Sequence, residues 1–289
     1  MSERWAIILH GGARKIEPED AQDNRRGCMA ALEIGHGLLS AGGEAIDAVE
    51  AVVRQLEADV TFNAGYGAVL NAEGVAQLDA AIMTGADLAV GAVAALEGVR
   101  HPVSVARRML SETDGLLVAG GARAFAARHG LLDKETGGPP RALSRASGDT
   151  VGCVVLDRSG HMAVGLSTGG LSGKSPGRVG DTPLPGCGFY VDDQVGGTAL
   201  SGDGEAITRT LLAARVMTAL ECVTPQNAAA CALAHLDRVG GEAGVIALDP
   251  RGWMGWAHTS PHFAMGLASH QLGPRVALHQ SELKDLLHA

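Results

Sequence analysis

Gly148-Asp149-Thr150-Val151-Gly152 is the stretch that decides the fold, because it joins a loop-like segment to an apolar strand. Residues 130–149 contain a Gly-Gly-Pro-Pro run and scattered charges, which is typical of an exposed linker. After Thr150 the sequence predicts a hairpin of two strands. The first covers residues 151–156 and the second covers residues 162–166. The chain is therefore expected to have two halves that meet at Thr150.

The halves on either side of this junction carry the same kinds of elements. Helices are predicted where apolar residues recur three and four apart, and strands where short apolar runs end at turn residues. The predicted helices cover residues 18–40, 44–59, 101–110, 119–129, 203–220 and 225–239, and the further strands cover 5–10, 75–83, 88–95, 244–248, 253–257 and 262–268. Strands grouped apart from helices predict an α+β fold, with two layers of sheet and helices outside them.

Composition excludes several classes of protein. Hydrophobic residues make up 46% and charged residues 19% of the 289 residues, so the chain is not a disordered one. Its net charge of −9 argues against nucleic acid or an anionic membrane as a partner. No apolar run is long enough to span a membrane, and the N-terminus lacks the pattern of a signal peptide. Five widely spaced cysteines predict reduced thiols, and with them a cytoplasmic location.

Two motifs that bind nucleotides or metals in other proteins are incomplete in this sequence. Gly173-Lys174-Ser175 resembles the end of a phosphate-binding loop, but Thr168 stands where that pattern requires its first glycine. His258 and His262 have the spacing of helical zinc ligands, but Pro261 lies between them. We therefore expect neither a nucleotide nor a catalytic metal, and no cofactor for catalysis.

A set of hydroxyl, glycine and charged residues remains after Thr150. If the bond between Asp149 and Thr150 were cut, the freed α-amine would have a pKa near ~8 and could activate the threonine hydroxyl as a nucleophile. Arg178 could bind a substrate carboxylate and Asp181 a substrate ammonium group. An alternative reading of these segments is purely structural, because glycine-rich turns, helix caps and surface ion pairs occur without catalysis.

The order of these segments resembles the plant-type L-asparaginase/isoaspartyl peptidase family of N-terminal-nucleophile hydrolases. The resemblance extends over nearly the whole chain. It rests on His10-Gly11-Gly12-Ala13, Phe62-Asn63-Ala64-Gly65-Tyr66-Gly67, Leu78-Asp79-Ala80, Gly148-Asp149-Thr150-Val151-Gly152, Ser167-Thr168-Gly169-Gly170, Gly177-Arg178-Val179-Gly180-Asp181 and Gly202-Asp203-Gly204-Glu205.

The resemblance implies a single four-layer αββα sandwich made as a precursor. Cleavage before Thr150 would give an α-subunit of residues 1–149 and a β-subunit of residues 150–289, and two such αβ units would form a dimer. The substrate would be L-asparagine or a β-aspartyl dipeptide, attacked at its β-carbonyl group to form an aspartyl-enzyme ester.

The resemblance also assigns roles to matching positions. Thr150 would be the nucleophile, supported by the Thr168 hydroxyl, while the Ser201 hydroxyl and the Gly202 N–H would form the oxyanion hole. Asn63 would help to shape the pocket, and Arg178 and Asp181 would bind the α-carboxylate and the α-ammonium group. A structural sodium ion would be held by main-chain oxygens of Leu56, Glu57, Asp59, Phe62, Ala64 and Tyr66.

Three positions depart from the family pattern. Ser201 replaces the usual threonine, so the hydroxyl is kept but the methyl group that restricts its rotamer is lost. Arg14 stands where glycine is usual. Asp203 adds a negative charge close to the expected oxyanion hole, where it would oppose the developing charge if it pointed inward.

Two other functions stay open at this point. A glycosylasparaginase, which acts on fragments of secreted glycoproteins, would use the same catalytic set, although the absence of a signal-peptide pattern and of paired cysteines counts against it. An unprocessed homologue that only binds amino acids would keep the fold without the free threonine amine.

Overall fold

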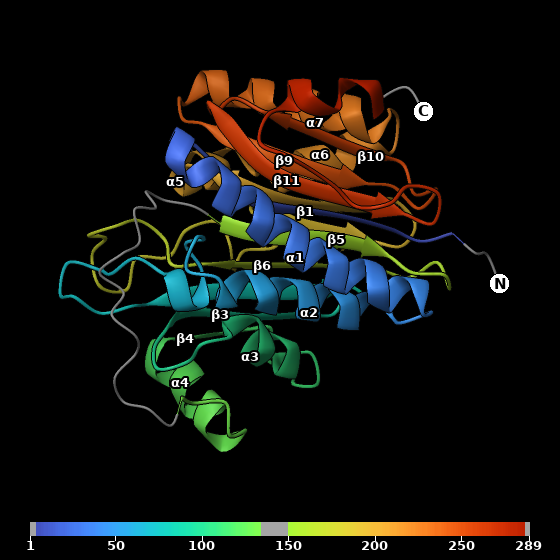
Figure 1. Ribbon diagram of the computed structural model, residues 1–289. Helices are drawn as coiled ribbons and strands as arrows, with labels where there is room; N and C mark the ends of the chain where they lie inside the picture. The colour runs from blue at the N-terminus through green and yellow to red at the C-terminus, as the bar shows by residue number, and fades with distance from the viewer. Residues whose placement is uncertain (1–3, 134–149, 287–289) are drawn as a thin grey trace.

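Two β-sheets lie at the centre of the molecule, and helices pack against them (Figure 1). The computed structural model describes residues 4–133 and 150–286. The predicted linker from residue 134 onward, with Asp149 of the predicted cleavage site, lies outside these residues. The chain thus has a mixed α/β architecture with two sheets.

The larger sheet has eight strands in the order β12-β11-β1-β5-β6-β2-β3-β4, and the smaller sheet has four in the order β10-β9-β8-β7. Neighbouring strands are antiparallel except for the parallel pair of β3 and β4. The strands are β1 Ala6–Arg14, β2 Leu78–Thr84, β3 Val90–Leu96, β4 Leu116–Val118, β5 Thr150–Leu156, β6 Met162–Thr168, β7 Phe189–Asp192, β8 Gly196–Gly202, β9 Ala243–Leu248, β10 Met254–His258, β11 His262–Ser269 and β12 Arg275–Ala277.

Seven α-helices and four short 3-10 helices occur in the part of the chain that the structure describes. The α-helices are α1 Ala21–Ser40, α2 Ala45–Ala58, α3 Pro102–Met109, α4 Ala119–Arg128, α5 Gly204–Thr210, α6 Leu212–Leu220 and α7 Pro225–Leu233. The 3-10 helices are η1 Pro18–Asp20, η2 Gly65–Gly67, η3 Ala234–Arg238 and η4 Gln280–Leu286.

Three apolar layers hold these elements together. Along β1, Ile7 and Leu9 pack under α1 and α2, whereas Ile8 faces the smaller sheet. Along β9, Ile246 faces the larger sheet, whereas Val245 packs against α6 and α7. Because alternate side chains of a strand point to opposite faces, a strand buried on both faces must be apolar throughout.

The structure differs from the sequence prediction in the second half of the chain. Strands β7 and β8 were not predicted, because β8 contains three glycines and only short apolar runs. The single helix predicted over residues 203–220 is two helices, since Leu211 adopts a left-handed conformation with φ 50° and separates α5 from α6. The predicted helix over residues 225–239 is α-helical to Leu233 and continues as η3.

Two expectations from composition can be compared with the structure. All five cysteines are free, as their spacing predicts. Within residues 4–133 and 150–286, no helix combines the length and the apolar character needed to cross a membrane.

Candidate active site

Thr150 is the first residue of β5, in the middle of the larger sheet (Figure 1). It is buried, and it pairs with Thr168 at the end of the neighbouring strand β6. The Thr150 hydroxyl lies 3.4 Å from the hydroxyl of Thr182, a distance at which either group can donate a hydrogen bond. The strand pairing therefore brings two of the predicted residues together and adds a third hydroxyl from a loop.

Ser201 lies near the end of β8 in the smaller sheet and reaches Thr150 across the gap between the sheets. Its hydroxyl oxygen accepts a hydrogen bond of 3.2 Å from the Thr150 backbone N–H and one of 3.1 Å from the Ala13 N–H. Ala13 can reach this oxygen because the register of β1 shifts between His10 and Gly12, where one residue bulges from the ladder.

A small polar pocket surrounds Thr150. Its cavity volume of about 10 Å³ is the space of a single water molecule. Of the predicted residues, Thr150, Thr168, Arg178, Asp181 and Gly202 line it. The other lining residues are Gly170, Leu171, Gly180, Thr182 and Gly204.

Arg178 lines this pocket, and its guanidinium group is hydrogen-bonded to the carboxylate of Glu205. Its Nε and Nη2 groups donate hydrogen bonds of 2.9 and 2.6 Å to the two carboxylate oxygens of Glu205. The Arg178 guanidinium lowers the pKa of Glu205 through these bonds. The Nη1 edge of Arg178 faces Gly170 and Gly180, where added Cβ atoms would lie 3.3 and 3.0 Å from it. These contacts fix the orientation of the guanidinium group.

Asp181 is buried, and one of its carboxylate oxygens, Oδ2, has no hydrogen-bond partner. Burial raises the pKa of Asp181 to about 7. A Cβ added to Gly204 would lie 2.8 Å from its other oxygen, Oδ1, so only glycine leaves the carboxylate this space. An unpartnered buried carboxylate oxygen is costly unless a cation or a donor binds there.

Asn63 and Thr168 both form hydrogen bonds with the backbone of Gly170. The Asn63 amide donates a 2.6 Å hydrogen bond to the Gly170 carbonyl and accepts one of 2.9 Å from the Val69 N–H. The Thr168 hydroxyl accepts a 3.0 Å hydrogen bond from the Gly170 N–H. Both side chains therefore fix the wall of the pocket at Gly170.

Asp203 does not point into the pocket. Its carboxylate accepts a 3.1 Å hydrogen bond from the Ala206 N–H and caps the N-terminus of α5. A carboxylate at this position stabilises the first turn of the helix. Gly202, the residue before it, has a φ of 147°, and a side chain there would collide with the Glu242 carbonyl oxygen.

Sequence reasoning assigned no role to several residues around the pocket. Thr182 follows directly after Asp181, so its place beside an expected site residue was the only available signal. Asp79 and Lys174 are both buried nearby, and burial raises the pKa of Asp79 and lowers that of Lys174. His10 is fully buried and adjoins Gly152, and burial lowers its pKa to about 3, so its imidazole is neutral.

Most of the chain matches one known protein family. The family model described as asparaginase matches residues 3–138 and 135–277, which together cover most of the chain. The chain belongs to the asparaginase family.

Relatives within this family span almost the same length. A probable isoaspartyl peptidase/L-asparaginase of Drosophila melanogaster is 37% identical, covering 91% of this chain and 92% of its own. The isoaspartyl peptidase/L-asparaginase of Danio rerio is 36% identical over 92% of both chains. The Homo sapiens protein of the same name is 36% identical over 89% of this chain and 92% of its own.

The segment expected to hold sodium in this asparaginase-family chain runs from the last turn of α2 into the loop that follows it. In this segment the carbonyl oxygens of Leu56, Asp59, Phe62 and Ala64 each accept a backbone hydrogen bond. A carbonyl oxygen has two lone pairs, so these bonds are compatible with a cation at the same oxygens. Main-chain oxygens suit a hard cation, and the sodium site stays a prediction.

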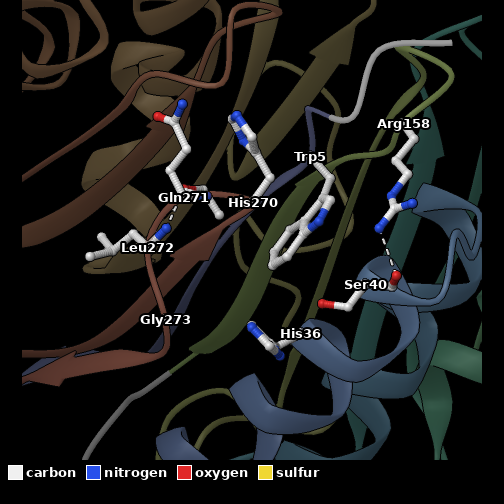
Figure 2. Close-up of a pocket in the computed structure, with 9 residues that line it drawn as sticks. Trp5, His36, Ser40, Arg158, His270, Gln271, Leu272 and Gly273 are labelled. Carbon is white, nitrogen blue, oxygen red and sulfur yellow. Dashed lines mark hydrogen bonds between the residues drawn. The ribbon is translucent and has the colours of Figure 1, made fainter.

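A larger hollow lies at the other end of β5, beyond Leu156 (Figure 2). Its volume is about 350 Å³, and Trp5, His36 and Arg158 line it. Arg158 donates a 2.6 Å hydrogen bond to the Ser40 carbonyl, drawn dashed in Figure 2. The seven residues of β5 separate this hollow from the pocket around Thr150, a span of roughly 20 Å.

Proposed function

We propose that this chain is an L-asparaginase and isoaspartyl peptidase that cleaves itself before Thr150 and then uses Thr150 as its nucleophile. The observation that carries the proposal is the meeting of Thr150, Arg178 and Asp181 in one pocket, with the Oδ2 atom of the buried Asp181 left without a hydrogen-bond partner. The relatives are named isoaspartyl peptidase/L-asparaginase, which supports L-asparagine and isoaspartyl peptides as substrates.

Self-cleavage would start from the Thr150 hydroxyl. Its oxygen attacks the Asp149 carbonyl carbon, an ester forms, the peptide C–N bond breaks, and the Thr150 nitrogen takes up the hydroxyl proton. Water then hydrolyses this ester and leaves Thr150 with a free amine. The Ser201 hydroxyl contacts this nitrogen before cleavage and so holds it beside the smaller sheet.

Turnover would repeat this chemistry on a bound substrate. The neutral amine takes the proton of the Thr150 hydroxyl as the oxygen attacks the β-carbonyl carbon. The oxyanion is stabilised by the Gly202 N–H and the Ser201 hydroxyl. The C–N bond breaks, and ammonia or an amino acid leaves with the proton. Water attacks the aspartyl ester, which releases L-aspartate and restores the threonine.

The head group of the substrate would be held by opposite charges. The Nη1 edge of Arg178 would face the α-carboxylate, and the buried Asp181 carboxylate, which lines the same pocket, would accept a hydrogen bond from the α-ammonium group. Thr182 and Thr168 would support the nucleophile and the pocket wall. Because the cavity has room for about one water, the substrate must displace neighbouring side chains to enter.

The remaining expectations are part of the same proposal. The two sheets with outer helices would form the four-layer αββα sandwich of N-terminal-nucleophile hydrolases, with subunits 1–149 and 150–289. Two αβ units would associate as a dimer. Carbonyl oxygens of Leu56, Glu57, Asp59, Phe62, Ala64 and Tyr66 would hold sodium and stiffen the loop that carries Asn63. Five free cysteines support a cytoplasmic location.

The intact mass of purified protein after incubation at neutral pH tests the proposal first. We expect the 29.5 kDa chain to give two fragments of about half that mass, with the second beginning at Thr150. L-Asparagine and β-aspartyl dipeptides should then be hydrolysed. Thr150→Ala should stay uncut and inactive, while Thr150→Ser, which keeps a hydroxyl, should still be cut.

Three results would overturn parts of the proposal. A stable single chain without activity would favour an amino-acid-binding protein. Turnover by Thr150→Ala would show that another residue is the nucleophile. Hydrolysis of glycosylated asparagine in preference to both expected substrates would favour a glycosylasparaginase.

A further inference from the structure

A second hollow, with a volume of about 250 Å³, lies where α5, α6 and η3 meet. It shares no residue with the pocket around Thr150. The residues that line it are Arg209, Thr210, Arg215, His235, Arg238 and Val239. Three of these six are arginines and none is acidic.

The backbone gathers these arginines by an uncommon turn. Leu211 adopts the left-handed conformation between α5 and α6, although its side chain is 53% exposed. This conformation costs a non-glycine residue about 1 kcal/mol or more. The turn it makes brings Arg209, before the break, and Arg215, after it, to the same hollow.

Two further contacts complete the arrangement. The Arg215 Nε group donates a 2.7 Å hydrogen bond to the Thr210 carbonyl, which fixes the plane of its guanidinium group. His235 and Arg238 are three residues apart on η3, one turn of a 3-10 helix, so they share one side. Asp237 lies between them in sequence but does not line the hollow.

The positive charges in the hollow lack counter-charges. Several arginines elsewhere pair with carboxylates, among them Arg178 with Glu205 and Arg251 with Asp249. Among residues 4–133 and 150–286, no carboxylate forms an ion pair with Arg209, Arg215 or Arg238. Three like charges around one space repel one another. In a chain of net charge −9, such a concentration of positive charge is a local exception.

We propose that this hollow binds a small oxyanion with two or more negative charges, of the phosphate or dicarboxylate class. The planar guanidinium group matches both kinds of oxyanion with paired N–H donors. The hollow, with its volume of about 250 Å³, is large enough for such an anion, and the anion would supply the missing counter-charge. The site is independent of the proposed hydrolysis, because no residue is shared between the two pockets.

Binding can be measured by titration calorimetry and thermal unfolding of the whole protein. The probes are inorganic phosphate, pyrophosphate and succinate, each compared with chloride at the same ionic strength. We expect at least one of the three to bind and to raise the unfolding temperature above that in chloride. Phosphate and succinate as separate arms distinguish the two ligand classes.

Charge-neutralising variants locate the site. Arg209→Gln and Arg238→Gln should each weaken anion binding about tenfold or more, and each should raise the unfolding temperature without anion by relieving repulsion. Arg275→Gln, an exposed arginine on β12, removes the same charge elsewhere and should bind as the parent protein does.

Either of two results would overturn the proposal. The first is that none of the three anions binds or stabilises the protein more than chloride does. The second is that Arg275→Gln weakens binding as much as Arg209→Gln and Arg238→Gln, which would mean general screening of surface charge.

Discussion

The hydroxyl oxygen of Ser201 lies 3.2 Å from the backbone nitrogen of Thr150. The two residues are 51 positions apart and lie on different sheets. The nitrogen is the atom that cleavage before Thr150 would convert into an amine. A residue expected to stabilise an oxyanion is therefore also positioned to orient the proposed catalytic base.

Removing the Ser201 hydroxyl should affect both stability and rate. Ser201→Ala leaves the N–H groups of Thr150 and Ala13 without this acceptor, which should cost about 1–3 kcal/mol of unfolding free energy. We expect kcat to fall about a hundredfold, as for loss of one oxyanion-hole group. Ser201→Thr keeps the hydroxyl and serves as the control in denaturant unfolding and steady-state assays. Full activity of Ser201→Ala would contradict both the role of Ser201 in the oxyanion hole and its role in orienting the Thr150 amine.

Arg178 should contribute mainly to substrate binding. Arg178→Ala removes a charged hydrogen-bond donor and should raise KM about tenfold or more, with kcat little changed. Glu205→Gln weakens the two bonds that orient the guanidinium group, so KM should rise by a smaller factor. Steady-state kinetics on L-asparagine give both values. A fall in kcat at constant KM for Arg178→Ala would assign it to the transition state instead.

Asp181 should make head-group binding depend on pH. Its pKa is about 7 in the unliganded pocket, and only its ionised form attracts an ammonium group. Affinity for L-aspartate should therefore fall about tenfold for each pH unit below 7. Calorimetric titrations between pH 5 and 8 measure this slope. Asp181→Asn should bind weakly and without the slope, and an unchanged slope in this variant would place the titration elsewhere.

The same carboxyl group should influence stability in the opposite sense to an ordinary paired aspartate. Its pKa is raised from 3.8 to about 7, so between these values the folded state keeps a proton that the unfolded state releases. The free energy of unfolding should therefore decrease as the pH rises through this range. Denaturant unfolding of Asp181→Asn should show a weaker decrease. An equal decrease in both proteins would contradict the shift.

Thr182 offers a test of a residue that only the structure revealed. Thr182→Val keeps the shape of the side chain but removes the hydroxyl group 3.4 Å from that of Thr150. We expect kcat to fall about tenfold, which corresponds to about 1.4 kcal/mol and so to the loss of one hydrogen bond to the Thr150 hydroxyl, while KM stays unchanged. Thr218→Val, on the exposed face of α6, is the matched control. Equal kcat values in the two variants would remove Thr182 from the mechanism.

The sequence was sufficient wherever a local pattern determined the structure. Apolar residues spaced three and four apart predicted α2 within one residue at each end, because one face of a helix must be buried. The apolar runs at residues 151–156 and 244–248 predicted β5 and β9, since strands buried on both faces are apolar throughout. The order of short motifs indicated the family before any geometry was considered.

Only the tertiary structure decided which groups meet. The contact of Ser201 with Ala13 joins residues 188 positions apart, and it depends on a bulge in β1 that no local pattern reveals. The pairing of Arg178 with Glu205 and the approach of Thr182 to Thr150 depend in the same way on the segment that connects β6 of the larger sheet to β7 of the smaller sheet. The break at Leu211 goes against the helical pattern around it. Sequence periodicity fixes which face of an element is buried, whereas the partners across that face are set by packing of the whole chain.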